Sequence, residues 1–445
     1  MITNSNNHYE LENEQLTKKF INQFSENSLP IEVSFKRIFP ELSNSDRFTH
    51  LIHSYPAKLL MHIPFFFLNN NFFSKKGDFV LDPFCGTGTV LLESVVSGRS
   101  ALGSDANPLA RLIAEVKTNK FSQKKLLANL EFMQTKYKRY KSADIPEVVN
   151  IDYWFPIATQ HKLAKLLRII KEIEEMKYRN FFLVCLSNCV KKVSLADPRV
   201  SVPVRLNPNR FPVGSQERKA VLARLKELEN IDVLQKFTAI CSDNIRRVRS
   251  LKGGGSQFAT SKIIASDARR LTKSLNSETQ LNDESVQLVI TSPPYAGAQK
   301  YIRSSSLSLG WLELAKNGDL KFLDKKNIGR ENFTQDELLI KPTGIESADE
   351  LINKIDSLDK TRACIVSEYL HGLTLALNES IRVLRKGGFL VIIVGNNKVC
   401  NLEFNTQEYL TEYLIKKGLI LQFKLIDDIK SYGLMTKRNK TADII

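Results

Sequence analysis

The chain is poor in the features that define metal sites, disulfide frameworks and membrane spans. Its six cysteines and six histidines, in 445 residues, show no paired metal-ligand spacing, so we expect reduced, buried thiols rather than a zinc site. The first residues, MITNSNNHYELENEQ, are too polar for a signal peptide, and the apolar run IPFFFL is too short to cross a bilayer. These absences predict a cytoplasmic protein with neither a metal nor a membrane partner, and they leave the oligomeric state open.

Negative charge is scarce in one part of the sequence. The chain has a net charge of +16, and the block from Lys117 to Lys252 has 28 Lys and Arg against 13 Asp and Glu, a net charge of +15. The rest of the chain therefore carries only +1. A merely soluble basic protein would spread this excess over its surface, whereas a concentrated excess favours a polyanionic partner. The block is therefore predicted to bind nucleic acid.

Strands and helices are expected to alternate on both sides of this basic block. Strand-like segments are GDFVLD and SALGSD before it and SKIIASD, SVQLVITSPPY, FLVIIVGN, LILQFKLID and TADII after it. This order predicts an α/β fold, a doubly wound, mostly parallel, seven-stranded Rossmann-like sheet interrupted by a mainly helical insertion. The expected boundaries are 1–50 for an N-terminal extension, 51–118 and 260–445 for the α/β domain, and 119–259 for the insertion.

The first motif, FVLDPFCGTGT (79–89), is a strand that runs directly into a G-x-G loop. Gly86 and Gly88 allow a sharp turn and a close approach of a ligand to the backbone. Asp105, which ends the next strand, is placed to accept ribose hydroxyls. Asp82 would repel a phosphate and has no other partner evident in the sequence, so it favours a cationic ligand such as S-adenosylmethionine. The alternative is a tight turn capped by Asp82.

The second motif, TSPPY (291–295), follows another expected strand. Pro293 and Pro294 fix two φ angles and lack N–H donors, so the carbonyls beside them are rigid acceptors. Ser292 places a hydroxyl before them, and Tyr295 places an aromatic ring after them. Acceptors beside a stacking ring suit an exocyclic amine on a flat base. A Pro-rich turn would explain the prolines but not the Ser and Tyr together.

Together, DPFCGTGT and TSPPY resemble the S-adenosylmethionine-dependent DNA amino-methyltransferases of restriction–modification systems, which methylate cytosine N4 or adenine N6. HSYPAKL, ASDAR and RVLRKGGFLVIIVGN resemble further segments of that family, and the resemblance covers roughly 50–118 and 260–445. It implies that the insertion is a target recognition domain and that double-stranded DNA is the partner. A cognate restriction endonuclease encoded nearby is a candidate second partner.

The resemblance also implies site residues and a mechanism. The target base would be flipped out of the duplex and stacked on Tyr295, while the Ser292 hydroxyl and the Pro293 carbonyl accept hydrogens from its amine. Methyl transfer is then an in-line displacement governed by positioning. The expected catalytic residues are Ser292, Pro293, Pro294 and Tyr295, and the expected cofactor-binding residues are Tyr55, Pro56, Asp82, Phe84, Gly86, Gly88, Asp105 and Asp267.

The identity of the target base rests on one residue. By the resemblance, Ser292 in place of Asp or Asn favours N4 of cytosine. Local chemistry leaves both bases open, because each presents a conjugated amine beside a ring-nitrogen acceptor. The alternatives are an adenine-N6 or RNA-base methyltransferase, and a non-catalytic nucleic-acid-binding protein with a degenerate fold.

Five residues are expected to contact DNA. Arg199, Arg205 and Arg210 lie on a Pro-rich segment of the insertion, SLADPRVSVPVRLNPNRFPVG, which suits phosphate or groove contacts. The alternative is an ordinary surface loop. Tyr301 and Arg303 follow the TSPPY motif and are expected to line the path of the flipped base.

Overall fold

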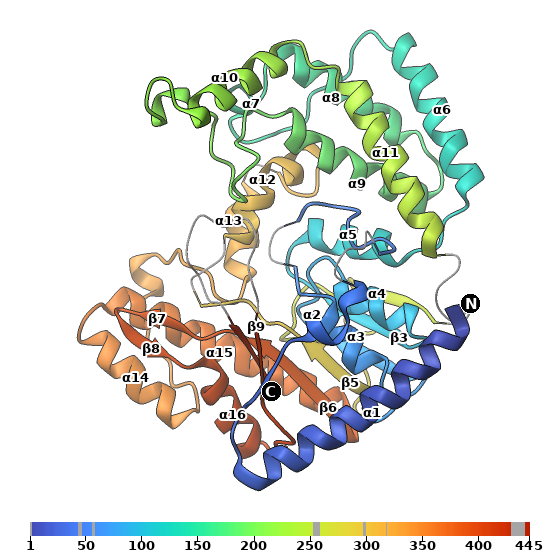
Figure 1. Ribbon diagram of the computed structural model, residues 1–445. Helices are drawn as coiled ribbons and strands as arrows, with labels where there is room; N and C mark the ends of the chain where they lie inside the picture. Colours follow the sequence, from blue (N-terminus) through green and yellow to red (C-terminus); the bar gives the residue numbers. More distant parts are fainter. Residues whose placement is uncertain are drawn as a thin grey trace.

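A mostly parallel sheet of eight strands forms the centre of the computed structural model, which describes residues 2–42, 47–55, 58–251, 259–296, 300–316, 318–428 and 441–445 (Figure 1). The strand order is β1-β9-β10-β6-β5-β2-β3-β4, and among the described strand pairs of this sheet only those of β10 are antiparallel. The strands are β1 (Ile31–Val33), β2 (Phe79–Asp82), β3 (Ser100–Ser104), β4 (Ser261–Ala265), β5 (Val286–Thr291), β6 (Leu384–Val394), β9 (Leu425–Asp428) and β10 (Thr441–Ile444), and β7 (Asn397–Val399) and β8 (Leu402–Phe404) form a separate hairpin.

All seven segments expected to be strands contribute to this sheet, and β1 is an eighth strand that the sequence did not predict. β1 pairs in parallel with β9 at the edge of the sheet. Its three residues, IEV, are too few to show the alternation that marks a strand. The segment TADII forms β10, which lies between β6 and β9 rather than at an edge.

Helices cover both faces of the sheet because successive side chains of a strand point to opposite faces. Leu288 and Ile290 of β5 pack in one core with α1 (Ile2–Asn27), α2 (Phe35–Ile38) and α3 (His62–Leu68). Val289 packs in a second core on the other face, beside α15. The remaining helices of the α/β part are α4 (Thr89–Val96), α5 (Pro108–Thr118), α12 (Tyr301–Trp311), α13 (Asp319–Lys326), α14 (Glu346–Asp356), α15 (Lys360–Val383), α16 (Thr406–Lys416) and the short 3₁₀ turns η1 (Pro40–Leu42) and η4 (Gln335–Glu337).

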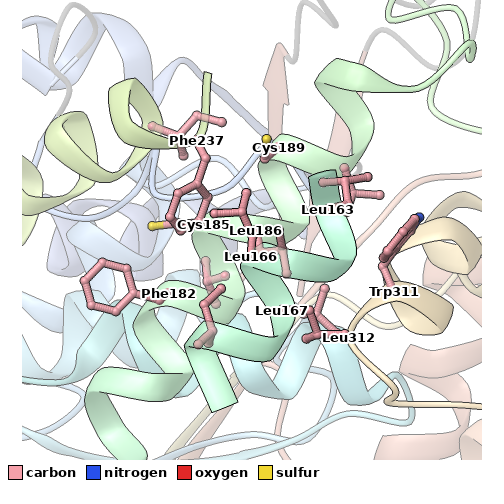
Figure 2. Close-up of a cluster of buried hydrophobic side chains, with 14 of the residues drawn as sticks. Leu163, Leu166, Leu167, Phe182, Cys185, Leu186, Cys189, Phe237, Trp311 and Leu312 are labelled. Atoms are coloured by element: carbon pink, nitrogen blue, oxygen red, sulfur yellow. The ribbon is translucent and has the colours of Figure 1, made fainter. Parts of the chain in front are cut away.

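The basic insertion is helical, as expected. Its helices stack on one side of the sheet, with α5 and α12 between the two parts (Figure 1). Figure 2 shows one core that joins Leu163, Phe182 and Phe237 of the insertion to Trp311 of α12. The insertion contains α6 (Gln123–Arg139), α7 (Ile151–Trp154), α8 (Ile157–Lys171), α9 (Met176–Val193), η2 (Pro208–Arg210), α10 (Gln216–Glu229) and α11 (Val233–Ser250).

The cysteines are all unpaired thiols. Five are buried, but Cys400 is only half-buried, so the expectation of burial is wrong for that residue. Among the described residues, no cluster of three His, Cys, Asp or Glu side chains is placed to hold a metal ion. No helix in the same part of the chain is both long and apolar enough to cross a membrane.

Candidate functional site

The two sequence motifs meet at one edge of the sheet. β2 lies between β3 and β5 and is parallel to both, so the carboxyl ends of these strands lie side by side. Asp82 ends β2, Asp105 follows β3, and Ser292 follows β5. The glycine loop and the TSPPY loop are therefore neighbours in space although about two hundred residues separate them.

A hydrogen bond joins the two loops directly. The Thr291 hydroxyl donates to Asp82 Oδ1 at 2.7 Å, and the same oxygen accepts the backbone N–H of Phe84 at 3.1 Å. The sequence-based expectation that Asp82 lacks a protein partner is therefore wrong. Burial raises the pKa of Asp82 to about 7; the two hydrogen bonds oppose this rise, and the nearby Asp105 adds to it.

The two glycines of the loop have different surroundings. Gly88 has φ +77°, and a Cβ there would lie 2.9 Å from the Cβ of Ala114 in α5. Gly86 has φ +50°, and a Cβ there would meet no atom within 4 Å. Gly88 thus allows α5 to pack against the loop, whereas the backbone at Gly86 is open to an approaching ligand.

Asp105 is held by the backbone on both sides. Its Oδ2 accepts the N–H of Gly86 at 2.9 Å, and its Oδ1 accepts the N–H of Asn107 at 2.8 Å. The Asn107 amide donates to the Tyr55 hydroxyl and to Ser305 Oγ, both at 2.9 Å. Asn107 therefore links Tyr55, the acid at the end of β3 and helix α12.

Tyr55 lies at the end of a segment that is anchored by buried charges. Glu93 of α4 accepts a hydrogen bond from Arg47 at 2.8 Å, and its other oxygen lies 2.6 Å from His50 Nε2. The Thr49 hydroxyl donates to the carbonyl of Lys117 at 2.6 Å, and the buried Lys117 ammonium donates to Thr87 of the glycine loop at 3.4 Å. These contacts fix the segment against the loop.

The TSPPY loop lies against aromatic residues. Phe84 of the glycine loop and Ala296, next to Tyr295, pack on the same apolar cluster around Tyr369 of α15. Burial raises the pKa of Tyr301, and the neighbouring Tyr295 and Asp105 add to the rise. A Cβ at Gly329 would lie 2.7 Å from the Tyr295 carbonyl oxygen, so the chain around Gly329 packs tightly on the loop.

The remaining two expected cofactor residues are Asp267 and Pro56. Asp267, which follows β4, has its two oxygens occupied by the Arg269 guanidinium at 2.9 Å each. Pro56 is outside the described residues. The roles of both remain predictions.

The expected DNA-binding arginines lie on a hairpin-like segment of the insertion, in which Ala196 bridges to Arg205. Arg199 makes a two-pronged contact with Asp197, and the Arg205 guanidinium lies 4.6 Å from the centre of the Tyr153 ring. Arg210 is exposed. Arg303 is exposed on α12, two residues after Tyr301.

Sequence reasoning missed Thr291 and Asn107. Thr291 is the first residue of TSPPY, and nothing in the sequence pairs it with Asp82, 209 positions earlier. Asn107 left a signal that could have been used: it precedes Pro108 at the start of a helix, and its side chain caps that helix by accepting the Leu109 N–H.

No family model matches this sequence, and no solved structure matches it either. Curated relatives do. The chain is 23% identical over 422 residues to type II methyltransferase M.MvaI of Kocuria varians, which covers 90% of this chain and 88% of that protein. It is 32% identical over 165 residues to type II methyltransferase M.MjaII of Methanocaldococcus jannaschii, and this match covers 34% of this chain and 30% of the relative. It is 24% identical over 258 residues to type II methyltransferase M.BsoBI of Geobacillus stearothermophilus, and this match covers 53% of this chain and 47% of the relative.

The similarity to methyltransferases of restriction–modification systems that the motifs predicted is therefore confirmed, and this chain is a relative of the type II methyltransferases.

Proposed function

We propose that the protein is a site-specific DNA methyltransferase that transfers the methyl group of S-adenosylmethionine to N4 of cytosine in duplex DNA. The bond between Thr291 and Asp82 is the observation that carries this proposal. It holds a loop suited to a cationic cofactor beside a loop suited to an exocyclic amine. Similarity to type II methyltransferases supports the reaction class, and Ser292 supports cytosine.

The residues at the sheet edge fit S-adenosylmethionine. The open backbone at Gly86 admits a ligand to the loop, and the Asp105 carboxylate lies where it can accept ribose hydroxyls. Phe84, in the same loop, provides an apolar side chain. The bound cofactor would supply a methyl group on a positively charged sulfur, and this positive charge would favour the ionised form of Asp82, whose pKa burial raises to about 7. Tyr55 would close the site from the segment anchored on Glu93.

On the acceptor side, the chain positions the amine rather than activating it by proton transfer; the N–CH3 bond forms as the S–CH3 bond breaks, and the methylated nitrogen then releases one of its two protons to solvent. Ser292 Oγ and the Pro293 carbonyl accept the two amine hydrogens and direct the nitrogen lone pair toward the methyl group. Tyr295 stacks on the extruded base, and such stacking contributes about 1–3 kcal/mol. Because flipping a base costs a few kcal/mol, this contact offsets much of that cost. We assign DNA recognition to residues 119–259, which carry most of the net positive charge of the chain.

The proposal is tested by incubating the protein with tritiated S-adenosylmethionine and mixed genomic DNA and identifying the methylated nucleoside by mass spectrometry. N4-methylcytosine is expected from the wild type and is expected to be absent from the Ser292→Ala/Tyr295→Ala variant. Ser285→Ala, just before β5 begins at the opposite end of that strand, is the matched control and should remain active.

Other products would revise the proposal in defined ways. N6-methyladenine would replace cytosine with adenine as the target. Methylated RNA in place of DNA would identify an RNA-base methyltransferase. Calorimetry without any cofactor binding would favour a non-catalytic nucleic-acid-binding protein.

A further inference from the structure

A small pocket lies where the insertion meets the α/β part, and hydroxyl groups interrupt its largely apolar wall. It is enclosed by the segment that contains His53, by α9, by α12 and by the loop after Asp197, and its volume is about 30 Å³. Seven of its lining residues carry hydroxyls: Ser54, Tyr55, Ser187, Ser201, Ser304, Ser305 and Ser308. Four of the serines already donate to protein acceptors, so the hydroxyls of Tyr55, Ser201 and Ser308 are the ones with a hydrogen left for a ligand that accepts hydrogen bonds.

The pocket has an excess of positive charge. Lys191 of α9 lines it, and its ammonium has no ion-pair or hydrogen-bond partner among the described residues. The one acid of the lining, Asp197, is neutralised because Arg199 donates to both of its oxygens, at 2.9 and 2.6 Å. A half-buried ammonium without a counter-ion therefore faces a group of hydroxyls.

His53 adds an unused nitrogen to the same lining. Its side chain is buried, its Nε2 lies 2.8 Å from Ser187 Oγ, and that oxygen lies 2.8 Å from Ser308 Oγ. Its Nδ1 has no hydrogen-bond partner in the described part of the chain. In the structure Ser187 donates to Ser308, so Nε2 donates to Ser187 and Nδ1 is an acceptor without a partner among the described residues. Because hydroxyl hydrogens rotate, a bound anion can reverse both bonds: Ser308 then donates to Ser187, Ser187 donates to Nε2, and the proton on Nδ1 faces the anion as a donor.

We infer that this pocket binds one backbone phosphate of the DNA strand that carries the flipped base. The inference rests on the proposed function. A free cation, several hydroxyls and an N–H donor are the groups that bind phosphate oxygens, and a volume of about 30 Å³ is too small for a base. The pocket is bordered by α12, which begins six residues after Tyr295, and by the segment with Arg199. A phosphate held there would fix the strand between the catalytic loop and the insertion.

The full-length protein is titrated with a fluorescein-labelled duplex of mixed sequence at several salt concentrations, and binding is followed by anisotropy. Lys191→Met should weaken binding about tenfold and reduce the log–log salt slope by about 0.9, the value for one lost phosphate contact. Ser201→Asp, which places a carboxylate in the pocket, should weaken binding at least as much. The matched control is Lys192→Met, which removes the same charge from an exposed neighbour outside the lining.

Equal slopes and affinities for Lys191→Met, Lys192→Met and the wild type would overturn the inference. Selective loss of binding to a labelled mononucleotide, with duplex binding unchanged, would assign the pocket to a free phosphate ester and also overturn it. Methyl transfer by the wild type to genomic DNA is measured alongside. If the wild type methylates DNA but Lys191→Met leaves duplex binding unchanged, the phosphate pocket is contradicted and the proposed reaction stands. If Lys191→Met weakens duplex binding but the wild type methylates no DNA, the proposed reaction is contradicted and the pocket stands.

Discussion

The sheet edge and the insertion segment with Arg199, Arg205 and Arg210 differ in how their charged side chains are placed: the acids of the edge are buried or half-buried, and the arginines lie at the surface. Asp82 is buried and Asp105 is half-buried at the sheet edge, and each accepts two hydrogen bonds from neighbouring groups. In the insertion, Arg205 lies on the face of Tyr153 and Arg210 is exposed. Strand ends thus give a charge one orientation at a desolvation cost, whereas a surface loop keeps its charge solvated and adaptable. The first arrangement suits a small ligand of fixed shape, and the second suits a long polyanion.

Asp82→Asn should have the largest effect, on stability as a function of pH. The folded protein holds a proton on Asp82 up to about pH 7, whereas the unfolded chain releases it near 3.8. The stabilisation is therefore complete below the unfolded value and is lost as pH rises through about 7, by up to about 4 kcal/mol. Asn stays neutral at every pH. In urea unfolding, the free energy of unfolding of the variant should therefore rise relative to that of the wild type between roughly pH 4 and pH 8. The control is Asp283→Asn, a carboxylate with a side chain that is 72% exposed. Parallel curves for wild type and Asp82→Asn would contradict the raised pKa.

Alanine at the two loop glycines should separate packing from ligand approach. Gly88→Ala places a methyl group 2.9 Å from Ala114 and should cost about 2–3 kcal/mol of stability. Gly86→Ala meets no atom and should cost only about 1 kcal/mol, but it should weaken S-adenosylmethionine binding in calorimetry. Wild-type affinity in Gly86→Ala would place the cofactor elsewhere.

Thr291→Val tests the link between the two loops. The variant keeps the shape of the side chain but removes the donor to Asp82, which should cost about 1–2 kcal/mol and slow methyl transfer. Thr291→Ser restores the hydroxyl and should recover both properties. A fully active Val variant would show that the loops are aligned without this bond.

Arg210→Ala should produce the smallest effect, a reduction of about 0.9 in the log–log salt slope of DNA binding. Lys386→Ala is the matched control, because its side chain is 91% exposed and it lies near the amino-terminal end of β6, away from the site. The same slope in both variants would exclude this segment from the DNA interface.

The sequence predicts the loops better than it predicts their contacts. GDFVLD and SVQLVITSPPY reveal their strands because apolar residues run directly into glycines or prolines, and parallel strand ends then meet at one edge. The Thr291–Asp82 bond and the Asn107 bridge depend on side-chain geometry between distant residues, which no local pattern encodes. β1 escaped detection because three residues show no periodicity. The surplus charge of the insertion is visible in the sequence, but the pairing of Arg199 with Asp197 is not.

The pairing of β1 with β9 has a consequence for the order of folding. Phe35 donates its N–H to Asp427, 392 positions later, and Phe20 of α1 contacts Phe423 at a ring separation of 5.9 Å. Closing so long a loop carries an entropic cost that local contacts do not, so this edge should form last. On the ribosome, Phe20 can pack on Phe66 of α3 early, but the part of α1 that Phe423 covers stays exposed until the chain has been synthesised to β9. Throughout that interval the nascent chain exposes an apolar surface that favours aggregation.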